Sequence, residues 1–277
     1  MPRLLIAGFG DIARRALPRL ERHFKITTLA RAVGCDLDRP ETLELAQADV
    51  LLHCVPPPDS GTTDTRTANL LAALEKGGIL PARVAYVSTS GVYGDCGGER
   101  IDETRPLNPQ TPRAQRRADA ERQLRAWCGL RSIALVVLRA PGIYARERLP
   151  LERLRARTPV LRREEDVYTN HIHADDLARA VARAVEDDAP AGVYNACDDS
   201  EIRMGDWMDL VADRFGLPRA PRLSRRELLA RVPAQMSSFM SESRRLDNRR
   251  LKELLGLRLR YPTVHQGLGY EHAVGID

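Results

Sequence analysis

Short apolar runs alternate with amphipathic segments over the first two thirds of the chain. The runs have strand length, whereas the segments between them repeat apolar residues at helical spacing. The predicted strands are Arg3–Ala7, Lys25–Leu29, Val50–Val55, Arg83–Ser88, Ile133–Leu138 and Gly192–Asn195. The predicted helices are Asp11–His23, Glu41–Ala46, Thr65–Lys76, Pro112–Trp127 and His173–Val185.

This alternation is typical of βαβ units, in which a parallel sheet is covered by helices. The runs 50–55 and 133–138 are apolar throughout, as expected for strands buried on both faces. We therefore expect an α/β fold with a doubly wound, Rossmann-like parallel sheet of about seven strands. From about residue 198 the pattern changes to helices at 204–215, 224–230 and 247–255, which predict a small, mainly helical C-terminal lobe.

A glycine turn follows the first predicted strand. Residues Gly8–Ala13 fit the pattern G-x-G-x-x-A between a strand and a helix. The first glycine allows a tight turn, the second lets the backbone approach a pyrophosphate, and the small third residue lets the helix pack on the strand. The helix start also offers free N–H groups and partial positive charge to phosphates. The alternative is a turn that binds nothing. The predicted dinucleotide contacts here are Gly8, Phe9, Gly10, Asp11 and Ile12.

The end of the second predicted strand bears on the choice of dinucleotide. It lacks the acidic residue that would bond the ribose 2′-hydroxyl of NAD, and it carries Arg31 instead. Arg31 can pair with a 2′-phosphate, which favours NADP over NAD, unless it is an ordinary surface arginine. Asp36 can bond the adenine amino group or cap a turn. Cys54, Val55 and Pro56, where the third strand ends, are predicted to line the cofactor.

Composition narrows the remaining function classes. The net charge is +5, and 40 of the 43 basic residues are arginine, spread along the chain among 38 acids. This distribution indicates a solvated mixed-charge surface rather than a nucleic-acid partner. The five cysteines have no C-x-x-C spacing and no nearby histidine pair, which argues against a metal site. No apolar run approaches the roughly 20 residues of a membrane helix, so we expect no membrane partner and a cytoplasmic location.

Several later segments carry a resemblance that spans nearly the whole chain. In order they are Ser88–Gly94, Pro141–Tyr144, His171–Ala178, Val193–Asn195 and Arg244–Asn248. With the N-terminal glycine turn, they resemble the extended short-chain dehydrogenase/reductases, the NAD-dependent epimerase/dehydratase superfamily. The last segment resembles an atypical bacterial branch of it.

The resemblance implies a dinucleotide-binding domain and a substrate lobe, with the active site between them. We expect residues 1–145 and 168–197 to form the first, and 146–167 and 198–277 the second. It also implies oxidoreductase or epimerase-type activity on a small polar or sugar-nucleotide-like substrate. Both a monomer and a homodimer are compatible with the sequence.

The family further implies a catalytic Ser/Thr, a Tyr and a Lys. The first falls on Thr89, three residues before Val92. Counting back from Glu121 puts Arg113 at the Tyr position and Arg117 at the Lys position. An arginine stays protonated and cannot exchange a proton with substrate, although Arg117 can still hold a ribose or phosphate.

Other side chains are then candidates for the acid or base. Tyr144 follows the Pro141 turn, which is predicted to lie beside the nicotinamide, and His171 and His173 precede a helix near the cleft. We take Tyr144 and His173 as the catalytic candidates. Packing of the tyrosine and a capping role for His173 are the alternatives. Three functions therefore remain open: an enzyme with a non-standard acid/base, a non-catalytic NAD(P)-binding sensor or regulatory protein, and a scaffold that has lost its cofactor too.

Overall fold

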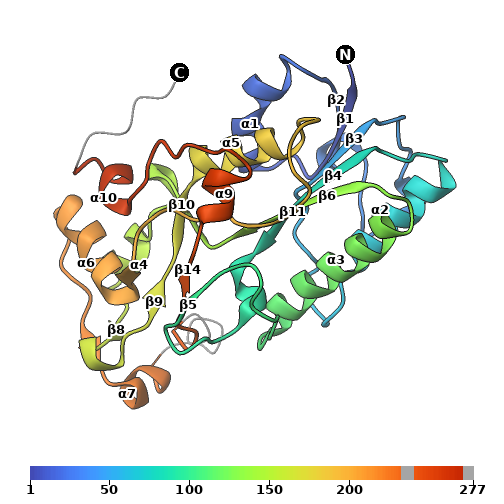
Figure 1. Ribbon diagram of the computed structural model, residues 1–277. Coiled ribbons are helices and arrows are strands. Elements are labelled where there is room, and N and C mark those ends of the chain that lie inside the picture. Colours follow the sequence, from blue (N-terminus) through green and yellow to red (C-terminus); the bar gives the residue numbers. More distant parts are fainter. Residues whose placement is uncertain (232–239, 271–277) are drawn as a thin grey trace.

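The computed structural model describes residues 1–231 and 240–270, and its centre is a parallel six-stranded sheet (Figure 1). The strand order is β11-β6-β4-β3-β1-β2. The strands are β1 (Arg3–Ala7), β2 (Lys25–Leu29), β3 (Val50–His53), β4 (Arg83–Thr89), β6 (Ala134–Ala140) and β11 (Gly192–Asn195). All six predicted strands are present, and the Rossmann-like α/β fold is confirmed with a strand count close to the expected seven.

The segment between β2 and β3 is too short to add another strand beside β2, which therefore forms the edge of the sheet. The predicted helix Glu41–Ala46 is wrong, because residues 30–49 form only two 3₁₀ turns, Arg31–Val33 and Pro40–Thr42, joined by irregular chain. A crossover between parallel strands needs a dozen or more residues. This segment is long enough to carry the chain from β2 to β3 but too short to hold another helix and strand.

Helices cover both faces of the sheet (Figure 1). On one face lie α1 (Asp11–Leu20), α5 (Ala174–Ala184) and α9 (Arg249–Glu253), and on the other lie α2 (Thr65–Lys76) and α3 (Pro112–Gly129). Side chains alternate between the two cores along each strand, so that Leu4 and Ile6 belong to the first core and Leu5 and Ala7 to the second. This alternation accounts for the continuous apolar runs in the sequence.

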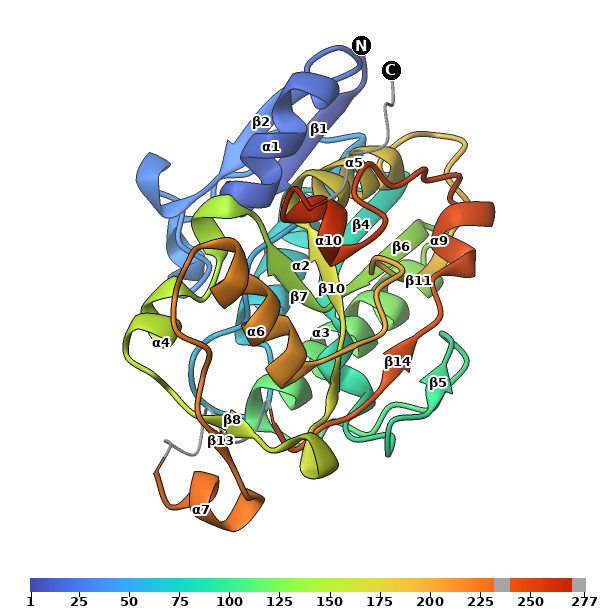
Figure 2. The same ribbon diagram turned by 90° about the vertical axis from the view of Figure 1, so that its left-hand side faces the viewer.

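The remaining elements gather beside the carboxyl ends of the strands (Figure 2). They include the helices α4 (Leu151–Arg155), α6 (Met204–Arg214), α7 (Arg225–Leu229) and α10 (Val264–Gly267). Two-stranded pairs accompany them: β7 (Gly142–Tyr144) with β10 (His171–His173), β9 (Tyr168–Thr169) with β12 (Ile202–Arg203), β8 (Val160–Leu161) with β13 (Arg222–Leu223), and β5 (Arg100–Ile101) with β14 (Arg245–Leu246).

This region has its own apolar core, which includes Leu154, Trp207, Val211 and Val264. The predicted helices at 204–215 and 224–230 are present in this region as α6 and α7, together with the short strand pairs, whereas the one at 247–255 is α9 and packs on the sheet instead of in the lobe. The exact division into two domains stays a prediction. Across the described residues, no helix is both long and apolar enough to cross a membrane.

Candidate functional site

The glycine turn lies where the sheet changes its direction of winding. The chain leaves β1 into α1 on one face and leaves the neighbouring β3 into α2 on the other, which opens a crevice between the two strand ends. Gly8 has a φ of +89°, and a Cβ there would lie 2.7 Å from the Val55 nitrogen. Only glycine suits that position. Gly10 has an ordinary φ of −86°, and a Cβ there would meet nothing within 4 Å. The space beside Gly10 is therefore open to a pyrophosphate, as the glycine motif requires.

A cavity of about 230 Å³ occupies this crevice and gathers most of the predicted cofactor residues. Its lining includes Gly8, Phe9, Gly10, Arg31, Asp36, Cys54, Val55 and Pro56. Arg31 is exposed, whereas the Asp36 carboxylate accepts a hydrogen bond of 3.0 Å from the Asp38 backbone nitrogen. That bond is the turn-capping role that the sequence left open for Asp36.

Arg117 is not part of this lining. Its Nη1 atom donates to the Tyr86 hydroxyl at 3.1 Å and to the Val87 carbonyl oxygen at 2.8 Å, which ties α3 to β4. The Tyr86 ring in turn packs against His53, with ring centroids 5.0 Å apart. Burial lowers the pKa of His53 to about 3, so this imidazole is neutral. Arg117 thus has protein partners, and its role toward a ribose stays a prediction.

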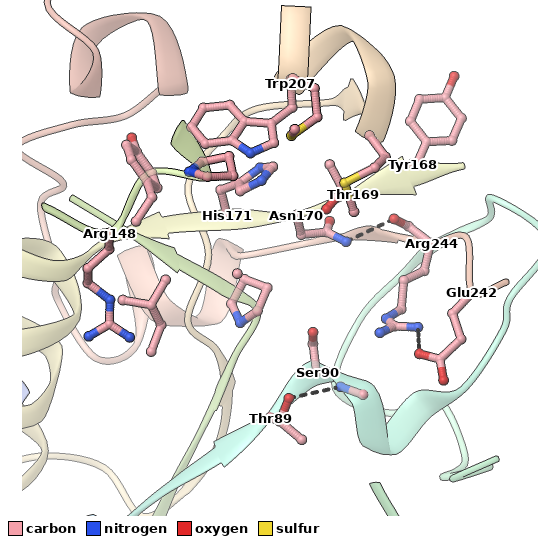
Figure 3. Close-up of a pocket in the computed structure, with 18 of the residues that line it drawn as sticks. Thr89, Ser90, Arg148, Tyr168, Thr169, Asn170, His171, Trp207, Glu242 and Arg244 are labelled. Atoms are coloured by element: carbon pink, nitrogen blue, oxygen red, sulfur yellow. Dashed lines mark hydrogen bonds and ion pairs between the residues drawn. The ribbon is translucent and has the colours of Figure 1, made fainter. Parts of the chain in front are cut away.

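Asp11, at the first position of α1, links the glycine turn to a second cavity. Its carboxylate accepts hydrogen bonds from Arg15 at 2.9 Å and Arg148 at 2.8 Å. Burial acts to raise the pKa of Asp11, but the bonds from these two arginines outweigh it and lower that pKa. Arg148 lines the second cavity (Figure 3). Its ion pair with Asp11 therefore joins the predicted pyrophosphate site to that cavity.

The second cavity has a volume of about 360 Å³ and lies between the strand ends and the lobe. One wall comes from Thr89, Ser90 and the turn that begins at Pro141. The opposite wall comes from α4, β9, β10 and α6, and Figure 3 shows His171 and Trp207 across from Thr89. The structure therefore brings Thr89, Arg113, Pro141 and Tyr144 to one cavity, whereas His173 does not line it.

Thr89 ends β4 with its side chain at the cavity wall. Its Oγ1 accepts a hydrogen bond of 3.3 Å from the Gly91 nitrogen and so caps the 3₁₀ turn Ser90–Tyr93 (Figure 3). This bond uses one acceptor site of the hydroxyl and leaves its hydrogen available to a substrate oxygen.

A buried ion pair supports this strand end. Arg139 on β6 meets Glu121 on α3 with two bonds, of 3.1 and 2.7 Å, and the Ser88 hydroxyl donates to the same carboxylate at 2.6 Å. Both charged side chains are at most 3% exposed. In the sequence, Glu121 was used only to find the positions that correspond to the family's Tyr and Lys. In the structure, Glu121 holds in place the residue that precedes Thr89.

Tyr144 and His173 both have structural partners. The Tyr144 hydroxyl donates to the Thr263 carbonyl oxygen at 3.3 Å and lies against Gly267, and burial raises the pKa of this phenol far above its usual value. His173 Nδ1 accepts from the Asp175 nitrogen at 3.2 Å and caps α5, and its ring lies 3.9 Å from that of Tyr261. These contacts favour the packing and capping alternatives, and the catalytic role of both residues stays untested.

His171 is the histidine that reaches the cavity. Its ring lies 4.5 Å from that of Trp207, and its buried Nδ1 has no hydrogen-bond partner within the described residues. Burial lowers the pKa of His171 to about 3, which keeps it neutral and able to accept a hydrogen bond.

Arg148, Arg153 and Trp207 also line the cavity, and no pattern in the sequence predicted them as site residues. In a chain with 40 arginines no local pattern marks two of them, and a tryptophan at helical spacing is typical of a core. Their positions depend on how α4 and α6 pack, which the sequence does not specify.

Comparison with known proteins supports the family that the sequence resembles. Residues 22–197 match the NAD dependent epimerase/dehydratase family, and the chain belongs to that family, as the sequence resemblance predicted. The match begins after the glycine turn, so the turn is an independent observation. No curated protein matches the chain.

Solved structures share the fold over almost the full length. A functionally unknown conserved protein from Silicibacter pomeroyi DSS is 29% identical, with a TM-score of 0.80 and 98% of each chain covered. A putative NAD-dependent epimerase/dehydratase from Methylobacillus flagellatus is 27% identical, with a TM-score of 0.74 and 97% of each chain covered. RMD from Pseudomonas aeruginosa, complexed with NADPH, is 19% identical, with a TM-score of 0.72 and 96% of each chain covered, and shows the same fold.

Proposed function

We propose that this protein binds NADP or NAD at the Gly8–Gly10 turn and works on a small polar substrate in the neighbouring cavity, as an oxidoreductase or epimerase. The observation that carries the proposal is the first cavity, where most of the predicted cofactor residues meet beside a turn that is open at Gly10. When bound, the nicotinamide supplies the hydride chemistry of this family.

Different residues of the chain bind the pyrophosphate and contact the substrate. The backbone at Gly10 and the start of α1 bind the pyrophosphate, because their N–H groups are free and lie at the positive end of the helix. The Asp11 carboxylate is neutralised by Arg15 and Arg148 and therefore does not repel the phosphates strongly. Thr89 donates its hydroxyl hydrogen to the oxygen of the substrate carbon that reacts.

Proton transfer is the step of the reaction for which these residues are least suited. Arg113 and Arg117 stand at the Tyr and Lys positions, and the candidates Tyr144 and His173 are held by Thr263 and Asp175. A positioned general acid or base contributes about 10²–10⁴-fold to rate. We therefore propose turnover slower by about that factor than in a relative with the Tyr–Lys pair.

We further propose a preference for NADPH over NADH. Arg31 is exposed on the lining of the first cavity, and no acid ends β2. A guanidinium there pairs with a 2′-phosphate, which NADH lacks.

The test is a titration of the full chain with NADPH and with NADH, followed by fluorescence, and then a turnover assay with carbonyl and sugar-nucleotide substrates. Saturable binding with turnover supports the proposal. Binding without any turnover supports the non-catalytic sensor instead, and no binding of either dinucleotide overturns both. Tighter binding of NADH contradicts the role of Arg31.

A further inference from the structure

Arg153, on α4, is a half-buried cation that the described part of the protein leaves without a counter-ion. Its side chain lines the second cavity, and its Nε and Nη2 atoms are both buried with no hydrogen-bond partner. Burial lowers the pKa of Arg153, and no acidic side chain acts in the opposite direction. In each of the other described arginines with a buried, unpartnered nitrogen, only Nε is left in that state.

Neighbouring arginines in the same cavity have partners. Arg148 donates to Asp11 at 2.8 Å, and Arg244 donates to Glu242 at 2.8 Å and to the Gly94 carbonyl oxygen. Among the described residues that line the cavity, Glu242 is the one carboxylate, and it forms an ion pair with Arg244. Four arginines (Arg113, Arg148, Arg153 and Arg244) and one carboxylate line the cavity, so the lining has an excess of positive charge, and Arg153 is the arginine among them with two buried, unpartnered nitrogens.

An unpaired buried charge is costly, and proteins normally pair such groups or hydrogen-bond them. An arginine kept in this state beside a cavity indicates that a ligand supplies the missing partner. Two of its nitrogens are free, and a guanidinium binds a carboxylate or a phosphate through two parallel hydrogen bonds.

The size of the cavity limits what that ligand can be. Its volume of about 360 Å³ is near the lower end of the roughly 300–1,000 Å³ range of small-molecule pockets. The nicotinamide end of the dinucleotide must share this space, because Thr89 and Pro141 form one of its walls. A nucleotide-linked sugar, with its base, ribose, two phosphates and hexose, would have to extend out of this space into solvent, whereas a small substrate fits within it. The apolar wall of Met204, Trp207 and Met208 suits a compact carbon skeleton.

We propose that Arg153 binds the anionic group, a carboxylate or a phosphate, of a small hydroxy or oxo substrate whose reacting oxygen meets Thr89. This inference rests on the proposed function for the position of the reacting carbon, but binding of the anion to Arg153 can be measured without the dinucleotide.

The experiment compares charged probes with neutral counterparts by calorimetry on the full chain, with and without NADPH. Pyruvate and methyl pyruvate form the carboxylate arm, and glyceraldehyde 3-phosphate and glyceraldehyde form the phosphate arm. We expect one charged probe to bind at least tenfold more tightly than its neutral counterpart, and the arm in which this occurs identifies the anion.

Arg153→Met is the test variant and Arg155→Gln its matched control. Arg155 lies on the same helix, but it is exposed, pairs with Glu152 and does not line the cavity. Charge-assisted hydrogen bonds are worth enough that their loss weakens binding by about 10–100-fold. We expect that loss in Arg153→Met and none in Arg155→Gln, while NADPH fluorescence shows unchanged dinucleotide binding in both.

A melting curve separates a binding role from a structural one. Because Arg153→Met removes an uncompensated, partly buried charge, we expect its melting temperature to equal or exceed that of the wild type, by up to about 4 °C. A clear fall, with anion binding weakened only in proportion to unfolding, would show that Arg153 stabilises the fold.

The remaining outcomes of these measurements also bear directly on the proposal. The proposal is overturned if neither charged probe binds, if the neutral probes bind as well as the charged ones, or if Arg155→Gln weakens binding as much as Arg153→Met. Failure of NADPH to bind, with anion binding at Arg153 intact, would overturn the proposed function and leave this site standing.

Discussion

Replacing Gly10 by alanine separates what the fold requires of the glycine turn from what a dinucleotide requires of it. The backbone at Gly10 has φ −86° and ψ −166°, which alanine also adopts, and an added Cβ meets no atom within 4 Å. Losing glycine at the start of a helix costs about 0.5–1 kcal/mol, and the smaller entropy of the unfolded chain returns about 0.4–1 kcal/mol. We therefore expect the free energy of unfolding to change by less than about 1 kcal/mol.

Dinucleotide binding should respond quite differently. The methyl group of Gly10→Ala occupies the space through which a pyrophosphate approaches the backbone. We expect the affinity for NADPH to fall at least tenfold, or about 1.4 kcal/mol. Fluorescence titration measures the affinity, and urea denaturation measures the stability.

Two matched variants complete this experiment. Gly129→Ala, at the end of α3, also places a Cβ in open space, so it should leave dinucleotide affinity unchanged and raise stability by at most about 1 kcal/mol. Gly8→Ala should destabilise the protein, because φ is +89° and the Cβ would lie 2.7 Å from the Val55 nitrogen. If Gly10→Ala binds NADPH as tightly as the wild type, the reasoning about the turn is wrong.

Three further predictions follow from charges and burial. Glu121→Gln should destabilise the protein by about 3–5 kcal/mol in urea denaturation, because it leaves the Arg139 cation buried and unpaired; replacing both partners by apolar residues should restore most of the loss. His171 is neutral when folded, with its pKa lowered to about 3, but takes up a proton below about pH 6.5 when unfolded. Stability should therefore fall from pH 7 to pH 5 by about 2 kcal/mol through this group, and His171→Gln should remove that part of the pH dependence; an unchanged pH profile would contradict it. Arg31→Ser should weaken NADPH binding about tenfold or more and leave NADH binding unchanged, whereas an equal effect on both would place Arg31 away from the 2′-phosphate.

The sequence predicted the sheet well because burial on both faces leaves a plain pattern. The runs that became β3 and β6 are continuously apolar, and their neighbours in the sheet cover both sides of each strand. The prediction failed at Glu41–Ala46, where a few apolar residues at helical spacing are too few to form a helix beside Pro40. The short strand pairs of the lobe were also missed, because two or three residues carry no periodicity.

The candidate site was predictable only where a residue's position follows from the chain itself. Gly8, Gly10 and Val55 come directly after strands, so the sheet alone brings them together. Arg153 lies on a five-residue helix, and whether its guanidinium has a partner depends on packing between segments far apart in sequence. The same is true of Tyr144, whose hydroxyl reaches the carbonyl oxygen of Thr263 only because α10 packs against β7.

The most direct test of the central claim is a titration of the wild-type protein with NADPH and NADH, followed by the change in dinucleotide fluorescence. We predict saturable binding at one site per chain, tighter for NADPH, and weakened at least tenfold in Gly10→Ala. Absence of saturable binding for both dinucleotides, by a protein that melts cooperatively, would contradict the claim that the glycine turn is a cofactor site.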